Sequence, residues 1–176
     1  MAGMRRTAIL GVVLLGALSG CGSLPEKSPP AGVDALVVPT PSPDPADFVA
    51  DPDGNDWFPL DGEPGEVDGI AAVAVATGST TDWYAEDTSG NVWWLGRDGE
   101  WQAGVDGALA GLAMPAQPRV GDGWRRALAD GVVDEVATVI ALDDETGLLS
   151  VEVVSAIDPD LDRVEVYADG DGLVEP

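Results

Sequence analysis

Few residue types in this chain could take part in catalysis or metal binding, and the counts of histidine and cysteine reduce the candidates further. The 176 residues include no histidine and one cysteine. Without imidazole there is no Ser-His-Asp or Cys-His catalysis and no histidine metal ligand. One cysteine excludes an internal disulfide and a zinc site built from several thiolates. Carboxylates and aromatic rings are therefore the groups left to consider, and a carboxylate pair, as in glycoside hydrolysis, is the one catalytic chemistry that remains.

Large aromatic side chains are concentrated in one short stretch. Because adjacent side chains on a strand point to opposite faces, one of each neighbouring pair can enter the core while the other stays on the outer face. An exposed aromatic row could stack on sugar rings or bind an apolar ligand. The alternative is cross-strand packing, worth about 0.2–1 kcal/mol per pair. The candidate ligand contacts are Trp83, Tyr84, Trp93, Trp94, Trp101 and, further along the chain, Met114.

Alternating aspartates raise the possibility of calcium. Asp158, Asp160 and Asp162 are spaced two residues apart, close to an acidic turn at residues 143–145. Calcium binds several oxygen ligands presented by such loops. Residues 51–56 alternate similarly but do not follow the EF-hand pattern. A calcium-stabilised adhesion or structural module is therefore one alternative, and a solvated acidic turn is the other.

The charge of the chain excludes one class of partner. The formal net charge is −24, and residues 56–176 hold 26 acidic residues against five arginines. Nucleic-acid binding depends on neutralising phosphates with Lys and Arg, so we expect no nucleic-acid partner. A surface this acidic is also repelled by anionic lipid headgroups.

The N-terminal elements predict export and a lipid anchor. Arg5 and Arg6 precede an uncharged apolar run at residues 7–18. As a helix this run spans about 18 Å, too short for a bilayer core of about 30 Å and typical of a signal helix. Leu18-Ser19-Gly20-Cys21 resembles a bacterial lipobox at all four positions. The resemblance implies that residues 1–20 are a cleaved signal peptide and that Cys21 carries a diacylglyceryl group. That group would hold the protein on the outer face of the cytoplasmic membrane, in the cell envelope, because two acyl chains give stable attachment.

A proline-rich segment follows the cysteine. Residues 22–55 contain eight of the 14 prolines. Proline fixes φ and removes a backbone donor, so this segment is not expected to pair into a sheet or to continue a helix. Residues 21–55 are therefore predicted to form the lipidated N-terminus and a disordered tether that lifts the following domain off the membrane.

Residues 56–176 are predicted to form one acidic, mainly β domain. Period-two alternation and short turns favour a curved antiparallel sheet, whether a meander, a half-barrel or a clam-like form. Residues 124–139 could instead be helical, although Gly131 and the valines weaken that alternative. Residues 103–121 read as a long loop, which either covers an open end of the sheet or acts as a lid. The expected strands lie within residues 70–77, 82–85, 91–95, 132–142, 148–157, 163–167 and 172–174.

Several motifs in this domain are similar to an uncharacterised family of secreted, β-rich bacterial proteins and lipoproteins. They include Gly90-Asn91-Val92-Trp93-Trp94, the Gly-Val-Asp-Gly-Ala loop at residues 104–108 and the Met-Pro-Ala-x-Pro-x-Val-Gly-Asp segment at residues 114–122. The resemblance implies a curved antiparallel sheet and no activity. We therefore expect a non-catalytic, cofactor-free binding module for a small apolar ligand or an envelope component. The alternatives are the calcium-stabilised module and a carboxylate-dependent hydrolase.

Overall fold

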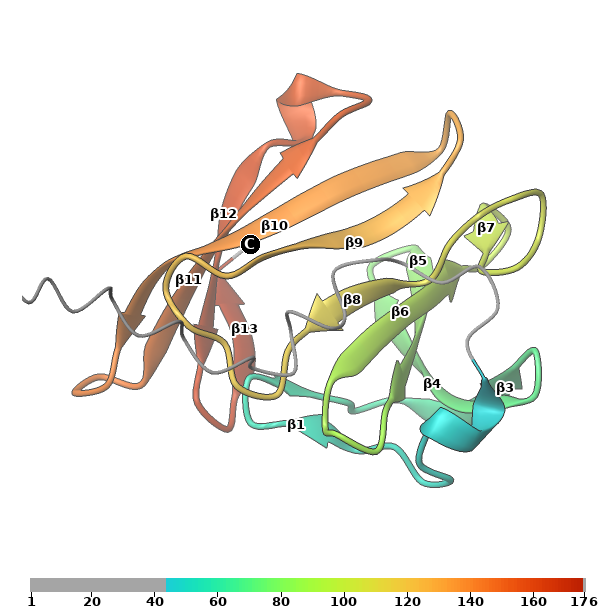
Figure 1. The fold of residues 1–176 in the computed structure, drawn as a ribbon, viewed down its shortest axis with the longest axis horizontal. Coiled ribbons are helices and arrows are strands. Elements are labelled where there is room, and N and C mark those ends of the chain that lie inside the picture. The colour runs from blue at the N-terminus through green and yellow to red at the C-terminus, as the bar shows by residue number, and fades with distance from the viewer. Residues whose placement is uncertain (1–43, 176) are drawn as a thin grey trace, which may run out of the picture.

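The computed structural model describes residues 44–175, which form three antiparallel sheets (Figure 1). The prediction of a mainly β, antiparallel fold is confirmed, and the sheets are open. The helical elements in this part of the chain are short 3-10 turns, η2 (Pro45–Asp47) and η3 (Pro159–Leu161). None of the helices within residues 44–175 is long and apolar enough to span a membrane.

The first large sheet is a meander in which each strand pairs with the next along the chain. Valine and alanine alternate through its second strand, and glycine-containing turns connect the hairpins. A further strand, β8, also pairs with β6, so residues 103–121 are not wholly a loop as expected. The strands are β3 (Glu63–Val67), β4 (Ile70–Thr77), β5 (Thr80–Glu86), β6 (Val92–Arg97), β7 (Trp101–Gln102) and β8 (Gly111–Met114).

The second large sheet is also a meander, in the order β13-β12-β11-β10-β9. The helical alternative for residues 124–139 is wrong, because these residues form two paired strands. Gly131 lies in the turn between them with φ +69°, a conformation that favours glycine. The strands are β9 (Gly123–Ala129), β10 (Val133–Asp143), β11 (Leu148–Ser155), β12 (Arg163–Ala168) and β13 (Gly172–Glu175).

Part of the predicted tether is folded onto the domain, which corrects the boundary placed at residue 56. Phe48 bridges to Asp87, and β1 (Gly54–Asn55) pairs with β2 (Phe58–Pro59). The Glu86 carboxylate accepts hydrogen bonds from the backbone N–H groups of Asp53 and Gly54, at 3.2 and 3.1 Å. The prolines leave these N–H groups free to pair, so the segment docks in spite of its composition.

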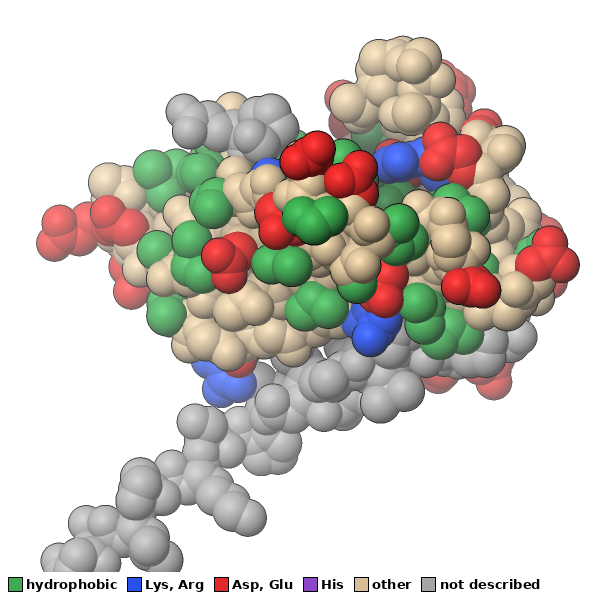
Figure 2. All heavy atoms as spheres, turned by 90° about the horizontal axis from the view of Figure 1, so that it is seen from above, with side chains coloured by type: hydrophobic (Ala, Val, Ile, Leu, Met, Phe, Trp, Pro, Cys, Tyr) green, Lys and Arg blue, Asp and Glu red, His purple; other side chains and the backbone are tan. Residues whose placement is uncertain are grey.

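The outer face of the second sheet carries several valines. Side chains alternate along β10 and β11, so that Ala137, Val151 and Val153 point into the core while Val136 and Val154 point out. The view from above shows hydrophobic side chains lying among carboxylates over one face of the molecule (Figure 2). The acidic composition is therefore spread over the surface between apolar side chains.

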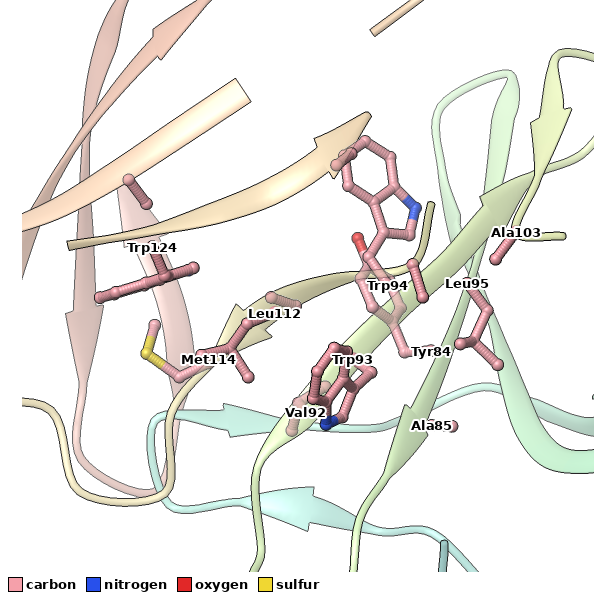
Figure 3. Close-up of a cluster of buried hydrophobic side chains, with 14 of the residues drawn as sticks. Tyr84, Ala85, Val92, Trp93, Trp94, Leu95, Ala103, Leu112, Met114 and Trp124 are labelled. Atoms are coloured by element: carbon pink, nitrogen blue, oxygen red, sulfur yellow. The ribbon is translucent and has the colours of Figure 1, made fainter. Parts of the chain in front are cut away.

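The main core lies where the two large sheets approach each other. Trp124 of β9 and Leu112 and Met114 of β8 are at most 2% exposed, and they belong to one cluster with the tryptophans of β6 (Figure 3). Gly111 permits this approach, because a Cβ there would lie 1.9 Å from the carbonyl oxygen of Arg126. The backbone contact between β8 and β9 therefore fixes the position of Arg126 relative to the first sheet.

Candidate functional site

A cleft of about 320 Å³ lies between the two large sheets. Strands β4, β5 and β6 supply one wall, and β9, β10, β12 and β13 supply the other, with β2 at the edge. Both walls carry ionisable side chains beside aromatic rings, as small-molecule sites do when a few polar groups fix the orientation of a ligand. The charged residues that line it are Asp82, Arg97, Arg126, Glu135, Arg163, Glu165 and Asp171.

The register of β4, β5 and β6 places the side chains of the first wall next to one another. Val75 of β4 lies opposite Asp82 of β5, and Asp82 lies opposite Arg97 of β6, so the three side chains share one face. Asp82 accepts hydrogen bonds from Arg97 Nε at 2.8 Å and from Trp94 Nε1 at 3.1 Å. The Arg97 guanidinium also lies 5.2 Å from the centre of the Trp94 ring, within the range of a cation–π contact.

The second wall is built around Glu165 of β12. Arg126 Nη1 donates to both Glu165 oxygens, at 2.9 and 2.8 Å. Arg163 Nε donates to Oε1 at 2.8 Å, and the Tyr167 hydroxyl donates to Oε2. Arg163 also donates to Glu135 at 3.3 Å, which extends the network to β10. Alternation along β12 directs residues 163, 165 and 167 to the same side of the sheet.

The electrostatics of this wall keep its charges in place. Burial raises the pKa of Glu165, but Arg126, Tyr167 and Arg163 outweigh that effect and hold the pKa below its ordinary value. Burial lowers the pKa of Arg126, yet the neighbouring Tyr167, Glu165 and Glu135 hold the pKa above the usual range. Glu165 is therefore a carboxylate at neutral pH, and Arg126 is a buried cation.

Two of the predicted ligand contacts line this cleft, Tyr84 and Trp94. Trp83 and Trp101 line a second hollow of about 400 Å³ beside β7, while Trp93 and Met114 line neither of these two cavities. The six predicted residues are therefore not brought together in one site.

Of the two alternatives for the aromatic stretch, an exposed row does not describe Trp93 and Trp94. Trp93 and Trp94 are 5% and 4% exposed, because both faces of β6 are covered. The ring of Phe48, in the N-terminal segment, meets Trp93 edge-on at 6.3 Å. On the opposite face Trp94 stacks on Tyr84 at 6.3 Å and meets Trp101 edge-on at 5.1 Å. The alternative of aromatic packing therefore describes this strand.

The aspartates proposed for calcium lie around η3. Asp158 Oδ1 accepts from the backbone N–H of Asp160 at 3.0 Å, and Asp162 Oδ1 accepts from that of Ser155 at 2.8 Å. Two of the three carboxylates thus bind the backbone of their own turn. Within residues 44–175, no group of three or more carboxylate, thiol or imidazole side chains is placed to hold a metal. Calcium binding stays a prediction.

Sequence reasoning missed the second wall of the cleft, although a signal for it was present. Arg163, Glu165 and Tyr167 alternate with valines on β12, so charged residues occupy the positions of one face. A charged inward face on a strand indicates a polar cavity or an ion-pair network. Arg126 lies two residues after Trp124, and both are buried, but the adjacent Arg125 and the bulge in β9 interrupt the pattern that would mark Arg126 in the sequence.

No protein-family model matches the chain, and neither a curated protein nor a solved structure matches it. The site is therefore interpreted from its geometry. Cys21, the predicted signal peptide of residues 1–20 and the predicted tether up to residue 43 lie outside the described residues. The lipobox and the similarity to secreted bacterial proteins remain predictions.

Proposed function

We propose that this chain is a lipid-anchored protein of the bacterial cell envelope that binds a small ligand in the cleft between its two large sheets. One observation carries the proposal. Of the five arginines in residues 56–176, three (Arg97, Arg126 and Arg163) line this cleft beside aromatic rings. Scarce cations gathered at one concave surface of an acidic chain favour a binding site there.

The lining sets limits on the ligand. A ligand that is apolar throughout would remove charged side chains from water and return no hydrogen bonds, which is costly. The rings of Phe58, Tyr84 and Trp94 favour an apolar portion as well. The proposed ligand is therefore a small molecule with an apolar body and a polar group.

The state of the carboxylates supports binding without catalysis. Asp82, Glu135 and Glu165 each accept hydrogen bonds from an arginine. A carboxyl group that donates a proton in hydrolysis needs a raised pKa, whereas that of Glu165 is lowered. The proposal therefore needs no cofactor and no acid–base step.

Ligand binding can be tested on protein isolated from the envelope. Native mass spectrometry of the parent protein should show a co-purifying species of defined added mass. Thr77→Trp places a ring into the cleft from its edge, and it should remove the species. Val120→Trp, at a position that is 61% exposed, is the matched control and should retain it. A parent protein that never carries such a species, and whose Tm does not rise with envelope extract, would contradict the proposal.

The lipid anchor has a separate test. Cells fed an alkyne-bearing fatty acid should label the parent protein, and Cys21→Ser should abolish the label and move the protein out of the membrane fraction. Two buried acyl chains would account for that difference in fractionation. If the variant kept both its label and its membrane fractionation, the anchor on Cys21 would be disproved.

A further inference from the structure

Two hydrogen-bond donors of the cleft have no acceptor among residues 44–175, and they indicate which polar group the ligand carries. From them we infer that the cleft binds a small carboxylate, whose oxygens accept from Arg126 and Tyr84 and whose apolar body lies against Phe58 and Trp94. The inference rests on the proposed function and specifies its ligand class.

Arg126 is the first donor. Its side chain is buried, and Nη1 is engaged by Glu165. Nε is enclosed and has no hydrogen-bond partner in the described part of the chain, and no described residue accepts from Nη2. Leaving a buried polar group unpaired costs about 1–3 kcal/mol, so such a group calls for an explanation. Nε is enclosed, so Nη2 is the nitrogen from which a ligand carboxylate can accept a charge-assisted hydrogen bond.

Tyr84 is the second donor. Its ring packs between Phe58, at 5.0 Å, and Trp94, at 6.3 Å, and the residue is 8% exposed. Its hydroxyl has no hydrogen-bond partner within residues 44–175, unlike that of Tyr167, which donates to Glu165. Burial raises the pKa of Tyr84, so the hydroxyl keeps its proton at neutral pH and can donate it. Both donors line the cleft, Tyr84 from β5 and Arg126 from β9.

The buried carboxylates of the cleft are already engaged. Glu165 receives hydrogen bonds from Arg126, Arg163 and Tyr167, and Asp82 receives them from Arg97 and Trp94. A ligand cation would therefore compete with arginines, whereas a ligand acceptor meets unused donors. A highly charged anion is disfavoured because the chain carries a net charge of −24. A monocarboxylate is the group that satisfies both conditions.

The size and lining of the cleft limit the rest of the ligand. A volume of about 320 Å³ lies at the small end of the range for ligand sites. Val75 and Leu173 add aliphatic surface to the aromatic rings of the two walls. The expected body is a single aromatic ring or a short branched chain, joined to the carboxylate by a few carbons.

Three matched probes test the inference: 3-phenylpropanoate, its amide, and 2-phenylethylamine. Binding to the full chain is followed by tryptophan fluorescence, since Trp94 lies in the wall, and by calorimetry. The carboxylate should bind in the millimolar range or tighter, the amide about tenfold more weakly, and the amine without detectable affinity. Tyr84→Phe should weaken carboxylate binding about tenfold, the effect of one hydrogen bond to a charged group. Its Tm should stay within about 1 °C of the parent, because no hydrogen bond within the described residues is lost.

Tyr167→Phe is the matched control, with the same chemical change at the other tyrosine. It breaks the hydrogen bond to Glu165, so it should lower the Tm and change the affinity for the carboxylate less than Tyr84→Phe does. Equal binding of the three probes, no binding of 3-phenylpropanoate, or an unchanged affinity in Tyr84→Phe would each overturn the inference. A species that co-purifies with the parent and is lost in Thr77→Trp would still support the cleft as a site, so the two proposals fail separately.

Discussion

Glu165 shows how one side chain can hold a wall of the cleft together. It is 4% exposed and accepts from Arg126, Arg163 and Tyr167. Replacing Glu165 with Gln removes the charge that balances the buried Arg126. We expect the free energy of unfolding at pH 7 to fall by about 3 kcal/mol, the usual cost of stranding one partner of a buried ion pair. Urea denaturation measures this difference.

The effect of Glu165→Gln on stability should also depend on pH. A carboxyl group whose pKa is lowered by folding stabilises the protein above its unfolded pKa, and that contribution is lost as the pH falls through its folded pKa. For Glu165 the ordinary value is 4.5 and the folded value lies lower. The difference in the free energy of unfolding between the parent and Glu165→Gln should therefore be largest at pH 7 and decrease below about pH 4.5. The exposed Glu152→Gln should show little difference at any pH, and a difference for Glu165→Gln that stays constant down to pH 3 would refute the assignment.

Asp87 organises the turn between β5 and β6. Its carboxylate accepts from the backbone N–H groups of Ser89 and Asn91, from the Asn91 side chain and from Trp93 Nε1 at 2.9 Å. Replacing Asp87 with Ala should leave these buried donors unpaired and lower the free energy of unfolding by about 3 kcal/mol. Chemical denaturation checks this. Asp144→Ala, in the exposed turn before β11, should change the stability by less than about 0.5 kcal/mol.

At the residue scale, the aromatic cluster shows what alternation can and cannot predict. Alternation correctly separates Trp83 from Tyr84, because Tyr84 faces the second sheet and Trp83 lines the hollow beside β7. It does not predict that both faces of β6 are covered, since that depends on Phe48 folding back from a distant part of the chain. Alternation alone therefore does not predict that both Trp93 and Trp94 are buried.

The strand β8 pairs with β6 and contacts β9, so it links the two large sheets, but local sequence does not reveal it. It has four residues, Gly111–Met114, and all four are buried, so no alternation marks it as a strand. The longer hairpins were predictable, because the β-branched runs of β10 and β11 flank a turn rich in Asp and Gly. Strands with their own periodicity were recovered, whereas β1, β2, β3, β7, β8 and β9 were not among the expected strands.

The contact between β8 and β9 gives a prediction at this scale. Gly111→Ala places a methyl group 1.9 Å from the Arg126 carbonyl oxygen, so one of the two strands must move. We expect the Tm to fall by at least about 5 °C and the cleft to lose affinity for any ligand held by Arg126. Gly123→Ala, on β9 with contacts of 3.6 Å, is the matched control and should fold like the parent. A Gly111→Ala variant of unchanged stability would show that the close approach is not needed.

For the molecule as a whole, repulsion between its negative charges destabilises the compact folded state. A net charge of −24 is spread over a surface on which acidic groups far outnumber arginines (Figure 2). Raising NaCl from about 0.05 to 0.5 M shortens the screening length and weakens this repulsion, so the Tm should rise by several degrees. The ion pairs of Arg126 are buried, so added salt weakens their attraction little. Choline chloride at the same ionic strength should give the same shift in Tm as NaCl. A fall in Tm with added NaCl would contradict the prediction. A larger rise in Tm with CaCl₂ than with NaCl would favour the calcium alternative.

The two walls of the cleft come from different parts of the chain, and this has a consequence for motion. Phe58 and Val75 belong to its first half, while Glu165 and Leu173 lie near its end. A ligand bound between them contacts both large sheets, which otherwise meet mainly along β8 and β9. Occupancy should then slow amide exchange in β4 and β12 together, so that the two halves open as one unit instead of independently.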